Sequence, residues 1–119
     1  MTTYEQLLAD CIRWAKEAGR IQLELFRSDR LDIEAKFNDS DVVTNADKAS
    51  EKAIISEIRR AYPEHSVLSE EAGCDKRMND WLWVIDPLDG TTNYSSGLPN
   101  FCVSIGVQHK GQTVVGVVY

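Results

Sequence analysis

Residues 81–93 read Trp-Leu-Trp-Val-Ile-Asp-Pro-Leu-Asp-Gly-Thr-Thr-Asn, and this stretch decides how the chain is interpreted. The apolar run at 81–86 predicts a strand, and its nearly continuous hydrophobicity places it inside a sheet with both faces covered. Asp86 and Asp89 close this run. If the strand simply continued, side chains three positions apart would point to opposite faces. The proline and the glycine beside them favour a bend instead, which would bring the two carboxylates together.

A bend of this kind has a clear chemical use. Hard cations such as Mg²⁺ are bound by a few carboxylate and carbonyl oxygens together with water and substrate phosphate. Asp86, Asp89 and the carbonyl of Leu88 would converge on one or two such cations. Residues 91–93 predict the start of a short helix, whose free amides attract phosphate oxygens. The structural alternative is an Asp-Pro turn followed by an aspartate helix cap, and the DPxDG segment alone does not separate the two.

The composition indicates one small domain with its own core. The chain has 119 residues, of which 43% are hydrophobic, and a net charge of −6. That charge argues against nucleic acid or an anionic membrane surface as the main partner. Cys11, Cys74 and Cys102 are too widely spaced for a disulfide framework or a zinc site, which predicts free thiols and a cytoplasmic location. The sequence shows no leader peptide and no apolar run of the ~20 residues that a membrane span needs.

Two helices are predicted in the first half of the chain. Residues 3–27 show helical spacing of apolar residues, with Thr3 and Gln6 at capping-box spacing. Trp14 and Leu23 lie off the main apolar stripe, so this helix is expected to touch a second surface. A second helix is expected to begin near Thr44 or Asn45 and to end at Pro63, with Ala53, Ile54, Ile58 and Ala61 buried.

The remaining elements are predicted as strands and loops. Residues 31–37 alternate with period two and predict a strand, followed by a polar loop. Strands are also expected at 66–69, 101–108 and 113–119, the last two joined as a hairpin, while 72–80 is expected to be a charged loop. The fold class is therefore α+β, with two helices packed on a mixed or mainly antiparallel sheet. The last strand is apolar, so it must be covered by another chain, lie in the middle of the sheet, or belong to a longer protein.

Four segments in this order resemble the inositol monophosphatase family of Mg²⁺-dependent, lithium-sensitive phosphatases. They are Asp41-Val-Val-Thr-Asn-Ala-Asp47, His65-Ser-Val-Leu-Ser-Glu-Glu71, Asp86-Pro-Leu-Asp-Gly-Thr-Thr-Asn93 and the hairpin strands from Ser104 to Tyr119. The resemblance covers nearly the whole chain. It implies the layered, sugar-phosphatase-like fold of that family, with residues 1–119 as its N-terminal portion that binds metal and phosphate.

The resemblance implies a metal-binding role for the acidic residues. Glu70, Asp86 and the carbonyl of Leu88 would bind a first Mg²⁺, and Asp86 and Asp89 would hold a second. The cations would activate water and offset the charge on the attacking and leaving oxygens. Hydrolysis would then proceed without a covalent intermediate.

The resemblance also implies catalytic roles for Asp47, Thr91 and Glu70. Asp47 and Thr91 would be hydrogen-bonded and would position the attacking water, although Asp47 is also explained as a helix cap. Gly90, Thr91 and Thr92 would contact the phosphate, and Lys36 would contact the site from a nearby loop. The two histidines are expected at the surface or in turns, since hard cations prefer oxygen ligands.

Members of the family are longer and carry a further aspartate in a W-D-x-A motif, which this sequence lacks. The resemblance implies Mg²⁺-dependent hydrolysis of a small phosphomonoester such as inositol monophosphate, by a homodimer. Two alternatives remain open at this point. One is a non-catalytic binding or interaction module on the same scaffold. The other is a relative that acts on fructose 1,6-bisphosphate or on a bisphosphate nucleotide.

Overall fold

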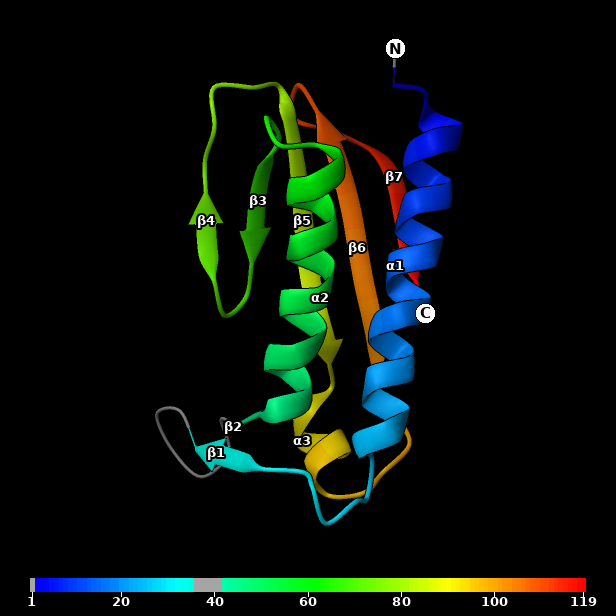
Figure 1. Ribbon diagram of the computed structural model, residues 1–119, viewed down its shortest axis with the longest axis vertical. Coiled ribbons are helices and arrows are strands. Elements are labelled where there is room, and N and C mark those ends of the chain that lie inside the picture. Colours follow the sequence, from blue (N-terminus) through cyan, green and yellow to red (C-terminus); the bar gives the residue numbers. More distant parts are fainter. Residues whose placement is uncertain (1, 36–41) are drawn as a thin grey trace.

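Two long helices lie side by side against one face of a five-stranded sheet, and a short helix and a two-stranded ribbon close one end (Figure 1). The computed structural model describes residues 2–35 and 42–119. The elements run in the order α1 (Tyr4–Leu25), β1 (Ile33–Ala35), β2 (Val42–Thr44), α2 (Asn45–Ala61), β3 (Ser66–Ser69), β4 (Gly73–Asp75), β5 (Trp81–Asp89), α3 (Thr91–Ser95), β6 (Cys102–His109) and β7 (Gln112–Val118). The α+β fold class is confirmed.

Both long helices begin at the capping boxes that the sequence predicts. Thr3 and Gln6 cap α1 reciprocally, and Thr44 and Asp47 do the same for α2. In each case the threonine side chain accepts a hydrogen bond from the backbone amide of the residue three positions later. The side chain of that later residue in turn accepts a hydrogen bond from the backbone amide of the threonine. The α2 helix ends one residue before Tyr62, in agreement with the stop expected from Pro63.

The sheet is mixed, with the strand order β4-β3-β5-β6-β7. The β3 and β5 strands pair in parallel, and the other neighbours pair antiparallel. The predicted hairpin joins β6 to β7 through Lys110 and Gly111, both at positive φ, as a tight two-residue turn requires. In this sheet β7 lies at the edge, so of the three alternatives for the apolar last strand, the position in the middle of the sheet is wrong for the described residues.

The main core fills the space between the two helices and the sheet. The α1 helix contributes Leu7, Cys11, Trp14, Ala15 and Ala18, and α2 contributes Ile54 and Ile58. The facing strands contribute Val67, Trp83, Ile85, Val103, Ile105, Val107 and Val115. A second, smaller cluster of Ala46, Leu88 and Tyr94 lies beneath α3. The second cluster ties α3 to the start of α2, which fixes the end of β5 against that helix.

Burial differs from the sequence prediction in three places. Trp14 belongs to the main core rather than to a second surface, whereas Leu23 is 66% exposed. On α2, the predicted burial of Ala61 is wrong, because this residue lies exposed in the last turn, and Ala53 is only half-buried. Residues with half-buried side chains alternate with buried ones along β5, so only the face toward the helices is fully covered. A central strand therefore has an apolar outer face that the described chain leaves partly open.

The strand prediction missed two short edge strands. The β2 strand pairs with β1, and β4 pairs with β3 inside the region expected to be a charged loop. All three residues of β4 are exposed, so hydrophobic patterning gives no signal for it. His65, expected at the surface or in a turn, is buried, and its Nδ1 accepts a hydrogen bond of 3.0 Å from the indole of Trp83. Within the described residues, neither long helix has the apolar length to cross a bilayer.

Candidate functional site

A β-bulge gives the end of β5 its unusual geometry. Asp86 pairs with Ser104 of β6, and Asp89 pairs with Cys102. The chain therefore advances three residues on β5 while it advances two on β6, which leaves one extra residue on β5. Side chains three apart would normally point to opposite faces, and one inserted residue restores them to the same face. The strand continues to Asp89, and this bulge takes the place of the bend that the sequence favours.

The burial of the four bulge residues agrees with this geometry. Pro87 and Leu88 are both buried, whereas Asp86 is half-buried and Asp89 is exposed. A proline is tolerated here because a bulge leaves a backbone position outside the regular ladder. The two intervening side chains therefore lie against the protein, whereas Asp89 is open to solvent and Asp86 is partly buried.

Glu70 lies beside this pair, directly after the neighbouring strand β3. The parallel register of β3 and β5 ends with Ser69 opposite Ile85. The next residues along the chain are Glu70, in the turn after β3, and Asp86, in β5. Neighbouring strands are about 4.8 Å apart, which brings these carboxyl groups close. The pKa of Asp86 is raised to about 7 by burial, by hydrogen bonding to and repulsion from Glu70, and by repulsion from Asp89. Three acidic groups therefore share one small region.

The donor chemistry of this region fits a hard divalent cation. The Oδ1 atom of Asp86 is buried and has no hydrogen-bond partner among the described residues. A buried oxygen that no donor satisfies, next to two further carboxylates, is the kind of ligand set that Mg²⁺ uses. Across residues 2–35 and 42–119, however, no three His, Cys, Asp or Glu side chains are close enough to hold a metal. Binding would therefore require Glu70, Asp86 and Asp89 to close around the ion.

Asp47 and Thr91 lie together, as the sequence resemblance implied. Asp47 is only 4% exposed, and its Oδ2 accepts hydrogen bonds from the amide and hydroxyl of Thr44 at 2.8 and 2.6 Å. Its Oδ1 is 2.9 Å from Thr91 Oγ1, which is also 3.1 Å from the carbonyl oxygen of Leu88. Helix cap and site contact therefore coexist in one carboxylate. The Thr91 hydroxyl has one proton for two acceptors, so its oxygen retains lone pairs that can accept from water.

Gly90 makes the turn between these two parts of the site. It is the N-cap of α3 and has φ 90° and ψ 36°, a left-handed conformation that disfavours side chains. A Cβ atom at this position would lie 2.8 Å from the backbone oxygen of Asn100 and 3.3 Å from Phe101 Cα. Only glycine fits here without movement of the neighbouring backbone. Thr91 is half-buried and Thr92 is exposed, both in the first turn of α3, where helix amides lack helical partners.

Gln22, which the sequence prediction missed, supports the bulge from α1. It is 1% exposed, and its Nε2 donates to the carbonyl oxygen of Pro87 at 2.6 Å and to Ser50 Oγ at 3.1 Å. Its own backbone carbonyl accepts the hydroxyl of Tyr94 at 2.7 Å. Gln22 follows Cys11, Ala15 and Ala18 at helical spacing on the buried face of α1. That spacing is the signal that could have identified it.

Replacing Gln22 with leucine should destabilise the chain by ~1–3 kcal/mol, because the buried carbonyl of Pro87 loses its donor. The side chain keeps nearly the same size, so packing changes little. Urea unfolding, followed by circular dichroism, measures the effect. The same substitution at Gln112, an exposed residue at the start of β7, is the control and should change stability by less than ~0.5 kcal/mol. Equal stability of Q22L and wild type would show that the contact does not support the bulge.

Lys36, the remaining predicted contact, lies outside the described residues. The structure brings together the other predicted residues in two neighbouring groups. One group is formed by the carboxylates of Glu70, Asp86 and Asp89. The other is formed by Asp47, the Leu88 carbonyl and Thr91. Gly90 and Thr92 lie at the junction of the two.

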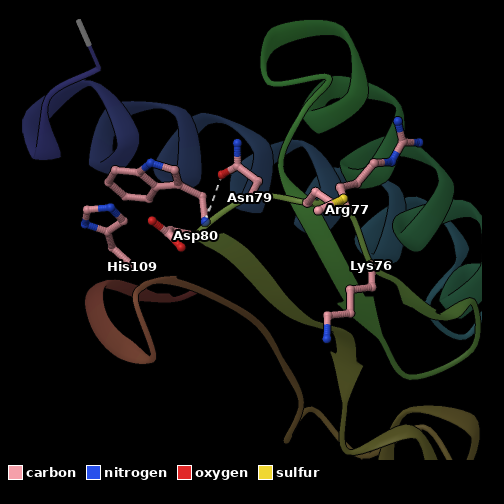
Figure 2. Close-up of a pocket in the computed structure, with 7 residues that line it drawn as sticks. Lys76, Arg77, Asn79, Asp80 and His109 are labelled. Carbon is pink, nitrogen blue, oxygen red and sulfur yellow. Dashed lines mark hydrogen bonds between the residues drawn. The ribbon is translucent and has the colours of Figure 1, made fainter.

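A separate hollow of about 830 Å³ lies at the opposite end of β5 (Figure 2). It is lined by Lys76, Arg77, Met78, Asn79, Asp80, Trp81 and His109. Trp81 starts the strand, and Asp86 is five residues on, about 17 Å away at the usual strand rise. The ring of His109 stacks on Trp81 with centroids 4.0 Å apart. The hollow contains none of the site residues, so its size gives no reason to place a substrate there.

Comparisons with known proteins point to one family. The sequence model of the inositol monophosphatase family matches residues 3–119. The Nus factor SuhB of Pasteurella multocida is 50% identical over 115 residues, which are 95% of this chain and 43% of that protein. The chain therefore spans less than half the length of the curated relatives it matches.

Solved structures share the fold. The inositol monophosphatase of Anabaena (Nostoc) sp. PCC 7120 superimposes with a TM-score of 0.79 and 39% identity, covering 99% of this chain and 41% of that chain. An IMPase/NADP phosphatase in complex with Mg²⁺ and phosphate superimposes with a TM-score of 0.84 and 25% identity, covering 99% of this chain and 45% of that chain.

Proposed function

This chain belongs to the inositol monophosphatase family, and we propose that it forms the Mg²⁺- and phosphate-binding part of an enzyme that hydrolyses a small phosphomonoester. The observation that carries the proposal is the bulge, which turns Asp86 and Asp89 to one face beside Glu70. The Mg²⁺ and phosphate found with the related IMPase/NADP phosphatase support the same chemistry. The chain spans about 43% of the length of the Nus factor SuhB of Pasteurella multocida. The activity of the whole protein is therefore part of the proposal.

The proposed Mg²⁺ ligands lie at and beside the bulge: Glu70, Asp86, Asp89 and the Leu88 carbonyl. The bound ion would lower the pKa of water and offset charge on the phosphate oxygens. The chain itself concentrates negative charge here, and that repulsion gives a divalent cation its favourable site. Glu70 comes from the turn after β3 and the other ligands come from β5, so a bound ion would join two separate segments of the chain.

Asp47 and Thr91 would orient the attacking water. The Thr91 hydroxyl donates its proton to Asp47 Oδ1, which leaves its oxygen lone pairs facing away from that carboxylate. A water that donates to this oxygen would pass a proton toward Asp47 through the hydroxyl. Asp47 is held on its other side by the amide and hydroxyl of Thr44, so the pair is fixed before substrate arrives. The amides of Gly90, Thr91 and Thr92 would bind the phosphate oxygens.

Release of inorganic phosphate from inositol 1-phosphate tests this function. We expect release by this chain to require Mg²⁺, to fall in the presence of Li⁺, and to be lost in an Asp86→Asn variant. Circular dichroism of both proteins controls for folding. No Mg²⁺-dependent release above that of the Asp86→Asn variant would overturn the proposed activity for this chain.

A binding role is the second candidate, and the 50% identity to a Nus factor favours it. The chain would then act by binding a partner, in a role of the kind that a Nus factor performs. The two functions differ in their need for the acidic residues. In cells that carry Asp86→Asn in place of the natural residue, a transcription reporter would be unaffected by the substitution if binding alone matters. Phosphatase activity would be lost in the same cells.

Three further properties remain proposals. A homodimer is expected from the family, and β7, as an exposed edge with Val118 72% exposed, offers a surface that a partner would cover. Lithium sensitivity would follow from competition at the Mg²⁺ site. A cytoplasmic location agrees with free cysteines at positions 11, 74 and 102.

A further inference from the structure

We propose that Glu51 is a positioning residue that fixes the turn carrying Glu70, so that Glu70 can meet Asp86 at the metal site. Glu51 lies in α2 and is not among the residues that the family resemblance assigned. Its role is to hold backbone, and it makes no contact with metal or substrate. The inference rests on the proposed function, because it concerns how that site is assembled.

The hydrogen bonds of Glu51 bracket Glu70 on both sides. Its Oε2 accepts the Ser69 hydroxyl at 2.8 Å, and Ser69 is the residue before Glu70. The same oxygen accepts the backbone amides of Glu71 and Ala72 at 3.0 and 3.1 Å. The side chain of Glu51 is buried, at 9% exposed. Hydrogen bonds to a charged acceptor are stronger than neutral ones, and burial protects them from competing water.

The direction of β3 explains why the turn needs a support. Ser69 is buried on the face toward the helices, while Glu70 is exposed. Asp86 follows the buried Ile85 and therefore lies on the opposite face of the sheet, and its interaction with Glu70 places Glu70 on that side as well. Glu51 therefore holds the turn from the helix side without blocking the side from which a cation would enter. Beyond Ser69, β3 and β5 share no further ladder pairs, so the ladder alone does not fix Glu70.

The spacing on α2 links this contact to the rest of the site. Asp47 and Glu51 are four residues apart, which places them on one helix face. Asp47 accepts a hydrogen bond from Thr91. Ser50 accepts a hydrogen bond from the Gln22 side chain, which also donates to the Pro87 carbonyl. Glu51 holds the turn at 69–72. One face of α2 thus contacts both segments that carry the proposed ligands, directly at the turn around Glu70 and through Gln22 at the bulge, as well as Thr91. A shift of any one segment would separate the carboxylates.

Two substitutions test the proposal in this chain. Glu51→Gln keeps the size of the side chain but replaces a charged acceptor with a neutral one, and Glu51→Ala removes the acceptor. We expect hydrogen exchange at the amides of Glu71 and Ala72 to speed up in both variants. We expect the Kd for Mg²⁺, measured by calorimetry, to rise ~10-fold or more, as is typical when a residue that orients a metal ligand is lost. Excess Mg²⁺ should restore phosphate release to Glu51→Gln but not to Asp86→Asn.

Glu57→Gln is the matched control, since Glu57 lies on the same helix and pairs with Arg60 at its surface. It should leave both the exchange rates and the Kd unchanged. Wild-type exchange at Glu71 and Ala72 in Glu51→Gln would overturn the proposal, and so would wild-type Mg²⁺ affinity in that variant. If the wild-type chain binds no Mg²⁺, the proposed function fails, while the exchange rates still decide whether Glu51 holds the turn.

Discussion

Replacing Asp86 with asparagine is expected to stabilise the metal-free chain at pH 8 and to abolish its stabilisation by Mg²⁺. Burial and the nearby carboxylates of Glu70 and Asp89 raise the pKa of Asp86 to about 7, so its charged form is unfavourable in the folded protein. Asp86 is only half-buried, and solvent screens part of this repulsion, so we expect a gain of ~1 kcal/mol. For a chain of this size that corresponds to about 3–5 °C in Tm.

The pH dependence of stability tests independently whether the charged form of Asp86 destabilises the folded protein. A carboxyl whose folded pKa is raised binds more protons in the folded state than in the unfolded state. The metal-free wild type should therefore lose stability as the pH rises from ~4 to ~7, and D86N should lack this loss. Thermal unfolding at a series of pH values, with and without Mg²⁺, measures both effects. Asp29→Asn, at an exposed turn position, is the control and should behave like wild type. A lower Tm of D86N at pH 8 without metal would contradict the proposed repulsion.

Gly90→Ala is expected to destabilise the chain by ~2–3 kcal/mol and to weaken Mg²⁺ binding. Alanine disfavours a φ of 90°, and its Cβ would lie 2.8 Å from the Asn100 backbone oxygen. That neighbour is backbone, so relief requires movement of the segment between α3 and β6. Such a movement would displace Asp89 and Thr91, which flank the glycine. Urea unfolding measures the stability, and calorimetry measures the affinity for Mg²⁺.

Gly116→Ala in β7 is the control for that experiment. An added Cβ there meets no atom within 4 Å, and the residue has no positive φ. We expect it to change stability by less than ~0.5 kcal/mol and to leave Mg²⁺ binding unchanged. If G90A and G116A were equally stable, the tight turn after Asp89 would not be required by the fold.

Sequence patterns predicted the elements that have strong local signals. The capping boxes at Thr3 and Thr44 located both helix starts, and the stop before Pro63 located one helix end. The hairpin between β6 and β7 followed from two apolar runs around Lys110 and Gly111. The short β2 and β4 strands were missed because pairing, rather than patterning, defines them. Trp14 was misplaced because it lies near the border of the apolar stripe on α1, and its burial comes from contacts with Tyr62 and Trp83, which are distant in sequence.

The acidic residues proposed as ligands were identified from the sequence, whereas the residues that support them were not. Asp86 and Asp89 are conspicuous in sequence, but the bulge that aligns them depends on the register with β6, which is a long-range property. Gln22 and Glu51 are polar residues on helix faces that also carry core residues. A polar side chain on a buried stripe is therefore the sequence signal for such a support. Their hydrogen-bond partners, at Pro87 and at residues 69–72, lie too far along the chain to be read from local spacing.

Line broadening by Mn²⁺ in the amide NMR spectrum of this chain tests the central claim most directly. Mn²⁺ prefers the same oxygen ligands as Mg²⁺ and broadens resonances near the site that it occupies. We predict broadening confined to the backbone around Glu70 and the segment from Asp86 to Thr92, reversed by excess Mg²⁺ and absent in D86N. Broadening that is spread evenly over the acidic surface, or that leaves these two segments unaffected, would contradict the account.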